Sequence, residues 1–116
     1  MTSVFYSAVE STPAGKSNYP IQFLVPPGHT SVEAWLLAGA SYGGNKPLRA
    51  RLVNEWGGAL SDSSDVYGSS VSRVKLQNVS FKNTDLHVPT VVKLEATNKS
   101  PEGGDAQVYG VLVVYS

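Results

Sequence analysis

The sequence of 116 residues contains no cysteine. This absence excludes disulfide bonds, a thiol nucleophile and the usual cysteine-based zinc sites. No segment approaches the roughly 18 consecutive apolar residues of a membrane span, so we expect a soluble protein without membrane insertion. The first ten residues, MTSVFYSAVE, lack the basic and apolar segments of a signal peptide. The location of the protein stays unknown on these grounds, and extracellular or virion-associated sites remain open.

Net charge is also lacking, because nine basic residues balance nine acidic ones. Without an excess of positive charge, the chain offers nothing that would attract nucleic acid. Low net charge leaves little repulsion between copies, which permits a homo-oligomer. A chain of this length forms one domain, and we assign residues 1–116 to it.

Helical periodicity is missing too, whereas strand patterns recur. Residues 21–44, IQFLVPPGHTSVEAWLLAGASYGG, predict a strand, a Pro-Pro-Gly turn, a second strand and a glycine-rich loop. An amphipathic helix over 31–39 is the alternative, but the preceding prolines and the following glycines favour a strand. In that strand alternate residues share the face that we expect to point inward: Val32, Ala34, Leu36 and Ala38.

Other segments alternate in the same way. Residues 47–54 place Leu48, Ala50 and Leu52 inward and Arg49, Arg51 and Val53 outward. Residues 106–115 are apolar on both faces, which predicts a central strand or one covered by a partner subunit. The remaining expected strands cover 4–10, 71–82 with a bulge near 77–78, and 88–96 with Pro89 at a strand start or an edge.

Residues 55–70, EWGGALSDSSDVYGSS, are ambiguous, because a short strand could lie near 59–61 or 66–68. Without a strand there, the loops after residues 39 and 97 fall at opposite ends of the molecule. One additional strand brings them to the same end. Seven or eight short strands separated by turn signals predict an all-β fold, an antiparallel β-sandwich that is jelly-roll-like.

Residues with catalytic or metal-binding chemistry are sparse. The two histidines, His29 and His87, fall in expected loops, and no G-x-S-x-G elbow is present. We therefore predict no enzyme and no catalytic residue. Asp62 and Asp65, in SDSSD, could offer oxygen ligands to calcium, although the spacing is not that of an EF-hand. We assign no metal ligand and no cofactor, and leave calcium open.

Surface recognition is the chemistry that remains. Tyr42, Trp56 and Tyr67 stand beside glycines in expected loops, where large aromatic rings are costly unless they stack on something. Sugars present apolar C–H faces to such rings, and polar side chains bond their hydroxyls. We therefore predict a glycan ligand, with the three rings stacking and acidic side chains accepting hydroxyl bonds: Asp62, Asp65 and Asp105. The alternative is that each ring caps an open end of the core.

Residues 23–44, FLVPPGHTSVEAWLLAGASYGG, resemble the motif that opens glycine-rich domains at phage tail-fibre tips. The closing VYGVLVVYS is similar to the valine-rich last strand of those domains, although this chain has fewer glycines after Gly44. The resemblance implies a structural or assembly subunit, such as a fibre-tip or shell protein that binds other protein chains.

The segment AGASYGG resembles a loop of the small calcium-dependent galactose-binding bacterial lectins, which are jelly rolls of nearly this length. This resemblance implies that the Tyr42 carbonyl would bind calcium and that residues 98–101, NKSP, form the late ligand loop. Lys99 stands where the lectins have a calcium-ligating aspartate, and Ala106 and Gln107 replace paired asparagines. The lectins' metal site therefore does not carry over, and we predict a lectin-like carbohydrate-binding module, with the assembly subunit as the alternative.

Overall fold

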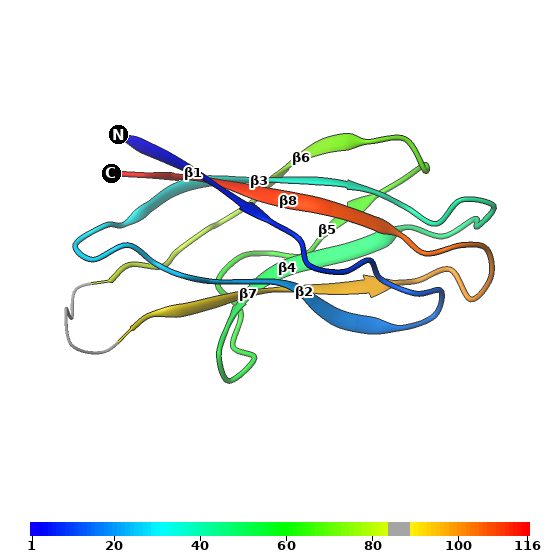
Figure 1. The fold of residues 1–116 in the computed structure, drawn as a ribbon, viewed down its shortest axis with the longest axis horizontal. Helices are drawn as coiled ribbons and strands as arrows, with labels where there is room; N and C mark the ends of the chain where they lie inside the picture. The colour runs from blue at the N-terminus through cyan, green and yellow to red at the C-terminus, as the bar shows by residue number, and fades with distance from the viewer. Residues whose placement is uncertain (84–88) are drawn as a thin grey trace.

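The computed structural model describes residues 1–83 and 89–116, which form eight strands in two four-stranded antiparallel sheets (Figure 1). His87 and Val88, the expected start of the seventh strand, lie outside the described residues. The described part includes no helix of the length and apolar character that crossing a membrane requires. The strands are β1 Thr2–Ser7, β2 Ser17–Leu24, β3 Ser31–Gly39, β4 Leu48–Asn54, β5 Ser64–Val66, β6 Ser72–Leu76, β7 Val91–Asn98 and β8 Gln107–Tyr115.

The strand order follows from one long hairpin folded over on itself. β1 pairs with β8, β2 with β7, β3 with β6 and β4 with β5. The pairs are therefore nested, with the first and last strands in the outermost pair and the chain reversing between β4 and β5. Two further pairings, β3 with β8 and β4 with β7, join these hairpins into sheets of order β1-β8-β3-β6 and β2-β7-β4-β5. This is the arrangement of a jelly roll, and the predicted all-β antiparallel sandwich is confirmed.

The alternation predicted for β3 and β4 holds at the core positions. Ala34, Leu36 and Ala38 are buried, as are the inward residues of β4: Leu48, Ala50 and Leu52. Two positions were predicted wrongly. Val32 is exposed, because the pairing of β3 with β8 shifts register between Ser31 and Glu33. Val53 is buried, because the chain after β4 folds back and bridges it through Ala59.

The ambiguous segment does contain a strand. β5 is only three residues long and pairs antiparallel with residues 48–50 of β4. It overlaps the second of the two expected segments only at Val66, and in the first segment Ala59 contributes only an isolated bridge. β5 reverses the chain direction once more. The loop between β3 and β4 and the loop between β7 and β8 consequently meet at one end of the sandwich (Figure 1).

The later strands follow the prediction with shifted bounds. β6 ends at Leu76, and Asn78 adopts a positive φ of 54°, so the irregularity expected near 77–78 ends the strand. Phe81 still returns to the core beyond it. β7 begins at Val91 and is central, between β2 and β4, and is not an edge strand. β8 is central as predicted, with β1 and β3 on its two sides.

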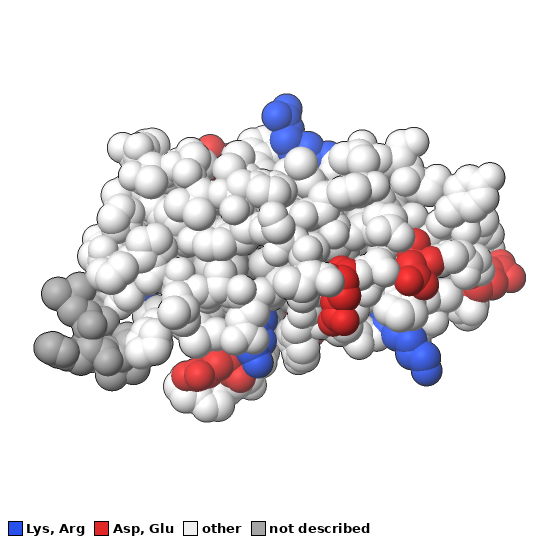
Figure 2. Space-filling model, in the orientation of Figure 1, with Lys and Arg blue, Asp and Glu red and all other residues white. Residues whose placement is uncertain are grey.

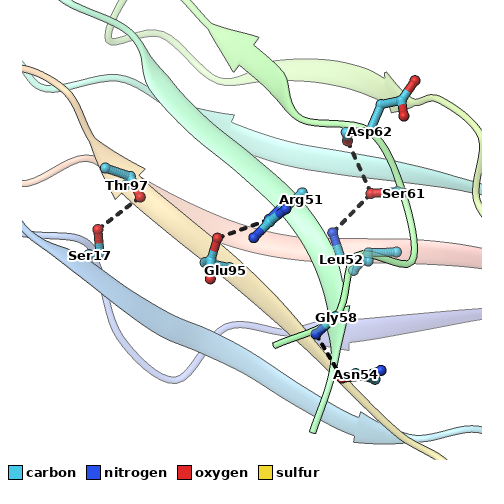
Figure 3. Close-up of polar contacts among 9 residues, drawn as sticks. All are labelled: Ser17, Arg51, Leu52, Asn54, Gly58, Ser61, Asp62, Glu95 and Thr97. Carbon is cyan, nitrogen blue, oxygen red and sulfur yellow. Dashed lines mark hydrogen bonds and ion pairs between the residues drawn. The ribbon is translucent and has the colours of Figure 1, made fainter. Parts of the chain in front are cut away.

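The outer faces of the two sheets differ in chemistry. The β2-β7-β4-β5 sheet carries ion pairs from Arg51 to Glu95 (Nε–Oε1 3.0 Å) and from Arg49 to Asp65. Figure 3 shows the Arg51–Glu95 pair beside the hydroxyl contact of Ser17 with Thr97. In Figure 2 the charged side chains on the visible side gather mainly over the lower layer and at one end.

The outer face of the β1-β8-β3-β6 sheet is mainly apolar. Register places Phe5, Leu112 and Trp35 in one row across β1, β8 and β3. Charge on this face comes from Glu33 of β3, which pairs with Lys75 of β6 (Nζ–Oε2 3.4 Å), and from Arg73 of β6. The Arg73 guanidinium and the Lys75 ammonium lie 5.3 Å and 5.8 Å from the centre of the Trp35 ring. We call this surface the apolar sheet face; it comprises Phe5, Trp35, Leu37, Leu112 and Val114.

From a buried tyrosine, Tyr115, and a partly buried one, Tyr6, we expect the fold to weaken at alkaline pH. The hydroxyl oxygens of Tyr6 and Tyr115 lie 2.9 Å apart, and burial raises the pKa of both above the ordinary value. Between about pH 10, where the unfolded chain begins to lose these protons, and the higher folded pKa values, the unfolded state binds fewer protons. The free energy of unfolding should therefore be undiminished below about pH 10 and fall as the pH rises further.

Urea denaturation from about pH 8 to about pH 11 measures this slope. Tyr115→Phe should flatten the alkaline decline, whereas Tyr109→Phe, at an exposed tyrosine, should follow the wild type. An identical decline in wild type and Tyr115→Phe would show that other groups are responsible.

Candidate functional site

Four loops meet at the end of the sandwich opposite the two termini (Figure 1). They are the β1–β2, β3–β4, β5–β6 and β7–β8 connections, covering residues 8–16, 40–47, 67–71 and 99–106. Binding residues are found most often in loops that a rigid scaffold positions, so a ligand site is expected where several loops meet. Three of the six predicted site residues lie in these loops, Tyr42, Tyr67 and Asp105, and Asp65 lies on β5 two residues before Tyr67.

A depression of about 330 Å³ opens at this end between the β3–β4 and β5–β6 loops. Tyr42 and Tyr67 line it, and they are 79% and 69% exposed. Neither ring caps the core, so the alternative role considered for these residues does not apply. Asn45, Lys46 and Ser69 add polar groups to the lining.

The Tyr42 loop is held by the β7–β8 loop through backbone contacts. The Gly104 amide donates to the Tyr42 carbonyl (2.9 Å), and the Ser41 hydroxyl donates to the Gly104 carbonyl. Gly103 makes this approach feasible, since a Cβ there would lie 2.6 Å from the Tyr42 oxygen. The Tyr42 carbonyl, which the lectin resemblance implied as a calcium ligand, therefore accepts a hydrogen bond within the protein.

The turn that carries Tyr67 is held against the end of β3. The Ala40 amide donates to the Gly68 carbonyl (2.8 Å), and Gly68 has a positive φ of 79°. Gly39 allows this contact, because a Cβ there would lie 2.6 Å from the Ser69 carbonyl oxygen. Both tyrosines are thus positioned by backbone contacts between loops.

Asp65 lies on β5, two residues before Tyr67, and forms a two-point contact with Arg49 on β4. The Arg49 Nε and Nη2 atoms donate to its two carboxylate oxygens at 2.9 Å and 3.3 Å. Arg49 lowers the pKa of Asp65 mainly through this hydrogen bonding, and the Tyr67 hydroxyl acts in the same direction. The Arg49–Asp65 pair lies on the outer face of the β2-β7-β4-β5 sheet, close in sequence to Tyr67 at the depression.

The other two acidic residues have separate partners. Asp105, at the same end of the molecule, accepts a hydrogen bond from the Ser11 hydroxyl (2.8 Å). Asp62, which precedes β5, accepts one from the side-chain amide of Asn78 (2.6 Å). The described residues include no group of three or more histidine, cysteine or acidic side chains that could hold a metal ion. The two carboxylates of SDSSD instead bond different partners, Asp62 with Asn78 and Asp65 with Arg49.

Trp56 is 84% exposed and stands apart from the two tyrosines. It lies in a tight turn in which the Asn54 side-chain oxygen accepts hydrogen bonds from the Trp56 and Gly58 backbone amides. Figure 3 shows the contact between Asn54 and Gly58. Seven-residue β4 separates this turn from the Tyr42 loop, a span of about 23 Å. The structure therefore does not join Trp56 and Asp62 to the Tyr42–Tyr67 depression, and it separates Asp65 from Trp56.

Arg49 and Ser69 are neighbours of the site that the sequence did not single out. Arg49 was expected to be solvated on an outward face, and only the pairing of β4 with β5 places Asp65 opposite it. Ser69 follows the Tyr67 turn in a segment whose strand content was ambiguous. No local pattern marks either residue, because both depend on contacts between distant segments.

No protein-family model and no curated protein matches the chain. Among solved structures, it is similar to a chain in the structure of infectious bursal disease virus Gx strain, with a TM-score of 0.46 and 15% sequence identity. The match covers 98% of this chain and 29% of the viral chain, so this chain spans less than a third of that length.

Proposed function

We propose that the protein is a lectin-like carbohydrate-binding module that binds a glycan in the Tyr42–Tyr67 depression without changing it chemically. The observation that supports this proposal is the pair of exposed tyrosines lining one depression. Hydrogen bonds already fix the backbone of both loops, so stacking of a ligand has to restrict only the side-chain torsions of the two rings. They offer flat apolar surfaces that match the C–H faces of a sugar.

The size and the polar lining of the depression fit a small polar ligand. Its volume of about 330 Å³ is at the lower end of the range for small-molecule sites, roughly 300–1,000 Å³. Asn45 and Ser69 supply hydrogen-bonding groups that can satisfy sugar hydroxyls. Arg49 neutralises the charge of Asp65, so the nearby carboxylate does not need a cationic ligand.

A glycan array probed in the presence of calcium, and again with a chelator, tests the proposal. We expect binding to a defined set of glycans that is the same in both conditions, because the ligand stacks directly on the protein. Binding that disappears with the chelator would instead require a metal ion among the loop oxygens. An array with no bound glycan in either condition would contradict the proposal.

The apolar sheet face supports a second candidate function, an assembly subunit such as a fibre-tip or shell protein. Phe5 on this face is 49% exposed, and its neighbours in the row, Leu112 and Trp35, are half-buried. Such a surface is typical of contacts with other protein chains. Sedimentation at high concentration distinguishes the candidates, since a clean monomer would count against assembly and leave glycan binding unaffected.

A further inference from the structure

Three of the four strands at sheet edges carry features that discourage pairing with another chain. β2 contains Pro20 and a register shift between Asn18 and Ile21. β5 is only three residues long, and β6 exposes Arg73 and Lys75. Proline, irregularity, short length and charge are the usual means by which proteins protect such edges.

β1 lacks all of these features. Its sequence, TSVFYS, has no charged residue and no proline, and all six residues pair with β8 without a register shift. Ser3, Phe5 and Ser7 are exposed. No other strand among the described residues pairs with β1 in either sheet. An exposed regular edge of this kind is a template for strand addition.

The backbone direction shows which groups are available at this edge. The Ala8 amide donates to the Tyr109 carbonyl (3.1 Å), continuing the pairing of β1 with β8. Antiparallel pairing alternates along a strand, so Val4 and Tyr6 also direct their amides and carbonyls toward β8. Ser3, Phe5 and Ser7 then direct theirs away from β8, toward the edge.

We propose that a second copy of this chain pairs with this edge, β1 against β1, antiparallel and centred on Phe5. Phe5 then lies opposite Phe5 of the partner subunit, and Ser3 lies opposite Ser7 of the partner subunit. The outward-directed groups of the two strands form about six backbone hydrogen bonds. The two β1-β8-β3-β6 sheets become one sheet of eight strands.

The sequence of β1 identifies the second strand as another copy. An antiparallel pair of identical strands has a two-fold axis, and SVFYS is nearly symmetric about its central residue. Serine meets serine at both ends, and Val4 meets Tyr6 of the partner subunit on the core side. No charged side chain of β1 opposes another across the axis.

Phe5 is already fixed in a position that suits this interface. Its ring covers Gly110 of β8, where an added Cβ would lie 2.3 Å from the phenyl Cζ atom. The ring is 49% exposed on the apolar sheet face, so both copies of Phe5 lie on the same outer face beside the axis. The inference does not depend on the glycan proposal, because β1 contributes no residue to the depression.

Sedimentation of the full chain and two charge variants tests the inference. The wild type should sediment as a dimer. Ser3→Lys with Ser7→Lys places two ammonium groups opposite each other on each side of the axis and should weaken the dimer by at least about tenfold. Ser3→Glu with Ser7→Lys places a carboxylate opposite an ammonium at the same positions and should retain the dimer. Both serines are exposed, so circular dichroism should show the wild-type fold in each variant.

Ser63→Lys with Ser80→Lys adds the same net charge at exposed serines outside β1, and should remain dimeric. A wild type that stays monomeric at high concentration would overturn the inference. So would a double-lysine variant of β1 that dimerises as tightly as the wild type. Dissociation of the Glu–Lys variant would overturn the proposed register.

Discussion

Tyr42→Ala and Tyr67→Ala are each expected to reduce affinity for the bound glycan by about 30-fold, equivalent to about 2 kcal/mol. Both rings are more than two-thirds exposed and line the same depression, so each truncation removes a stacking surface and little packing within the protein. The midpoint of thermal unfolding should stay close to that of the wild type. Calorimetric titration with a glycan selected from the array measures the loss.

Trp56→Ala is the matched control for this experiment. Trp56 is 84% exposed, as open to solvent as either tyrosine, but stands at the other end of β4. Its truncation should leave affinity unchanged. Loss of binding in Trp56→Ala, with Tyr42→Ala and Tyr67→Ala unaffected, would move the ligand to the tight turn after β4 and contradict the proposed site.

The hydroxyl of Tyr67 and its ring contribute separately, and phenylalanine variants distinguish them. Tyr42→Phe keeps the stacking surface and should bind nearly as well as the wild type. Tyr67→Phe also keeps the ring but removes the hydroxyl that helps lower the pKa of Asp65. An affinity lower than that of Tyr42→Phe would assign part of the binding to this hydroxyl.

The strands of the core could be predicted because their signal is local. Ala34, Leu36 and Ala38 alternate with partly exposed neighbours, and the pleat of a strand turns that spacing directly into one buried face. Val53 shows where the local signal ends. Val53 is buried because the segment after β4 folds back and bridges it through Ala59. The alternation of residues within β4 cannot predict this contact.

The candidate site could be predicted only as separate parts. Each aromatic residue was expected in an exposed loop, and Tyr42, Trp56 and Tyr67 are all exposed. The presence of β5 decides which of these residues lie at the same end of the sandwich. β5 is a three-residue strand in a serine- and aspartate-rich segment that has no apolar alternation. β5 forms because residues 48–50 of β4 offer it a partner, so its existence is a property of the sheet.

Gly103→Ala should both destabilise the protein and weaken glycan binding. Gly103 has a positive φ of 90°, which costs an L-residue about 1–2 kcal/mol. The new Cβ would also lie 2.6 Å from the Tyr42 carbonyl oxygen and 2.8 Å from the Gly44 amide nitrogen, both backbone atoms that cannot rotate away. We expect a total loss of about 3 kcal/mol in the free energy of unfolding, measured by urea denaturation.

Gly57→Ala separates the two causes of this loss. Gly57 has a similar φ of 85°, but an added Cβ there meets no atom within 4 Å, so only the conformational cost of about 1–2 kcal/mol applies. Gly57 also lies in the Trp56 turn, so its substitution should leave glycan affinity intact. If Gly103→Ala costs no more than Gly57→Ala and binds glycan normally, the β7–β8 loop does not hold Tyr42 in place. In that case the ring is positioned by the β3–β4 loop itself.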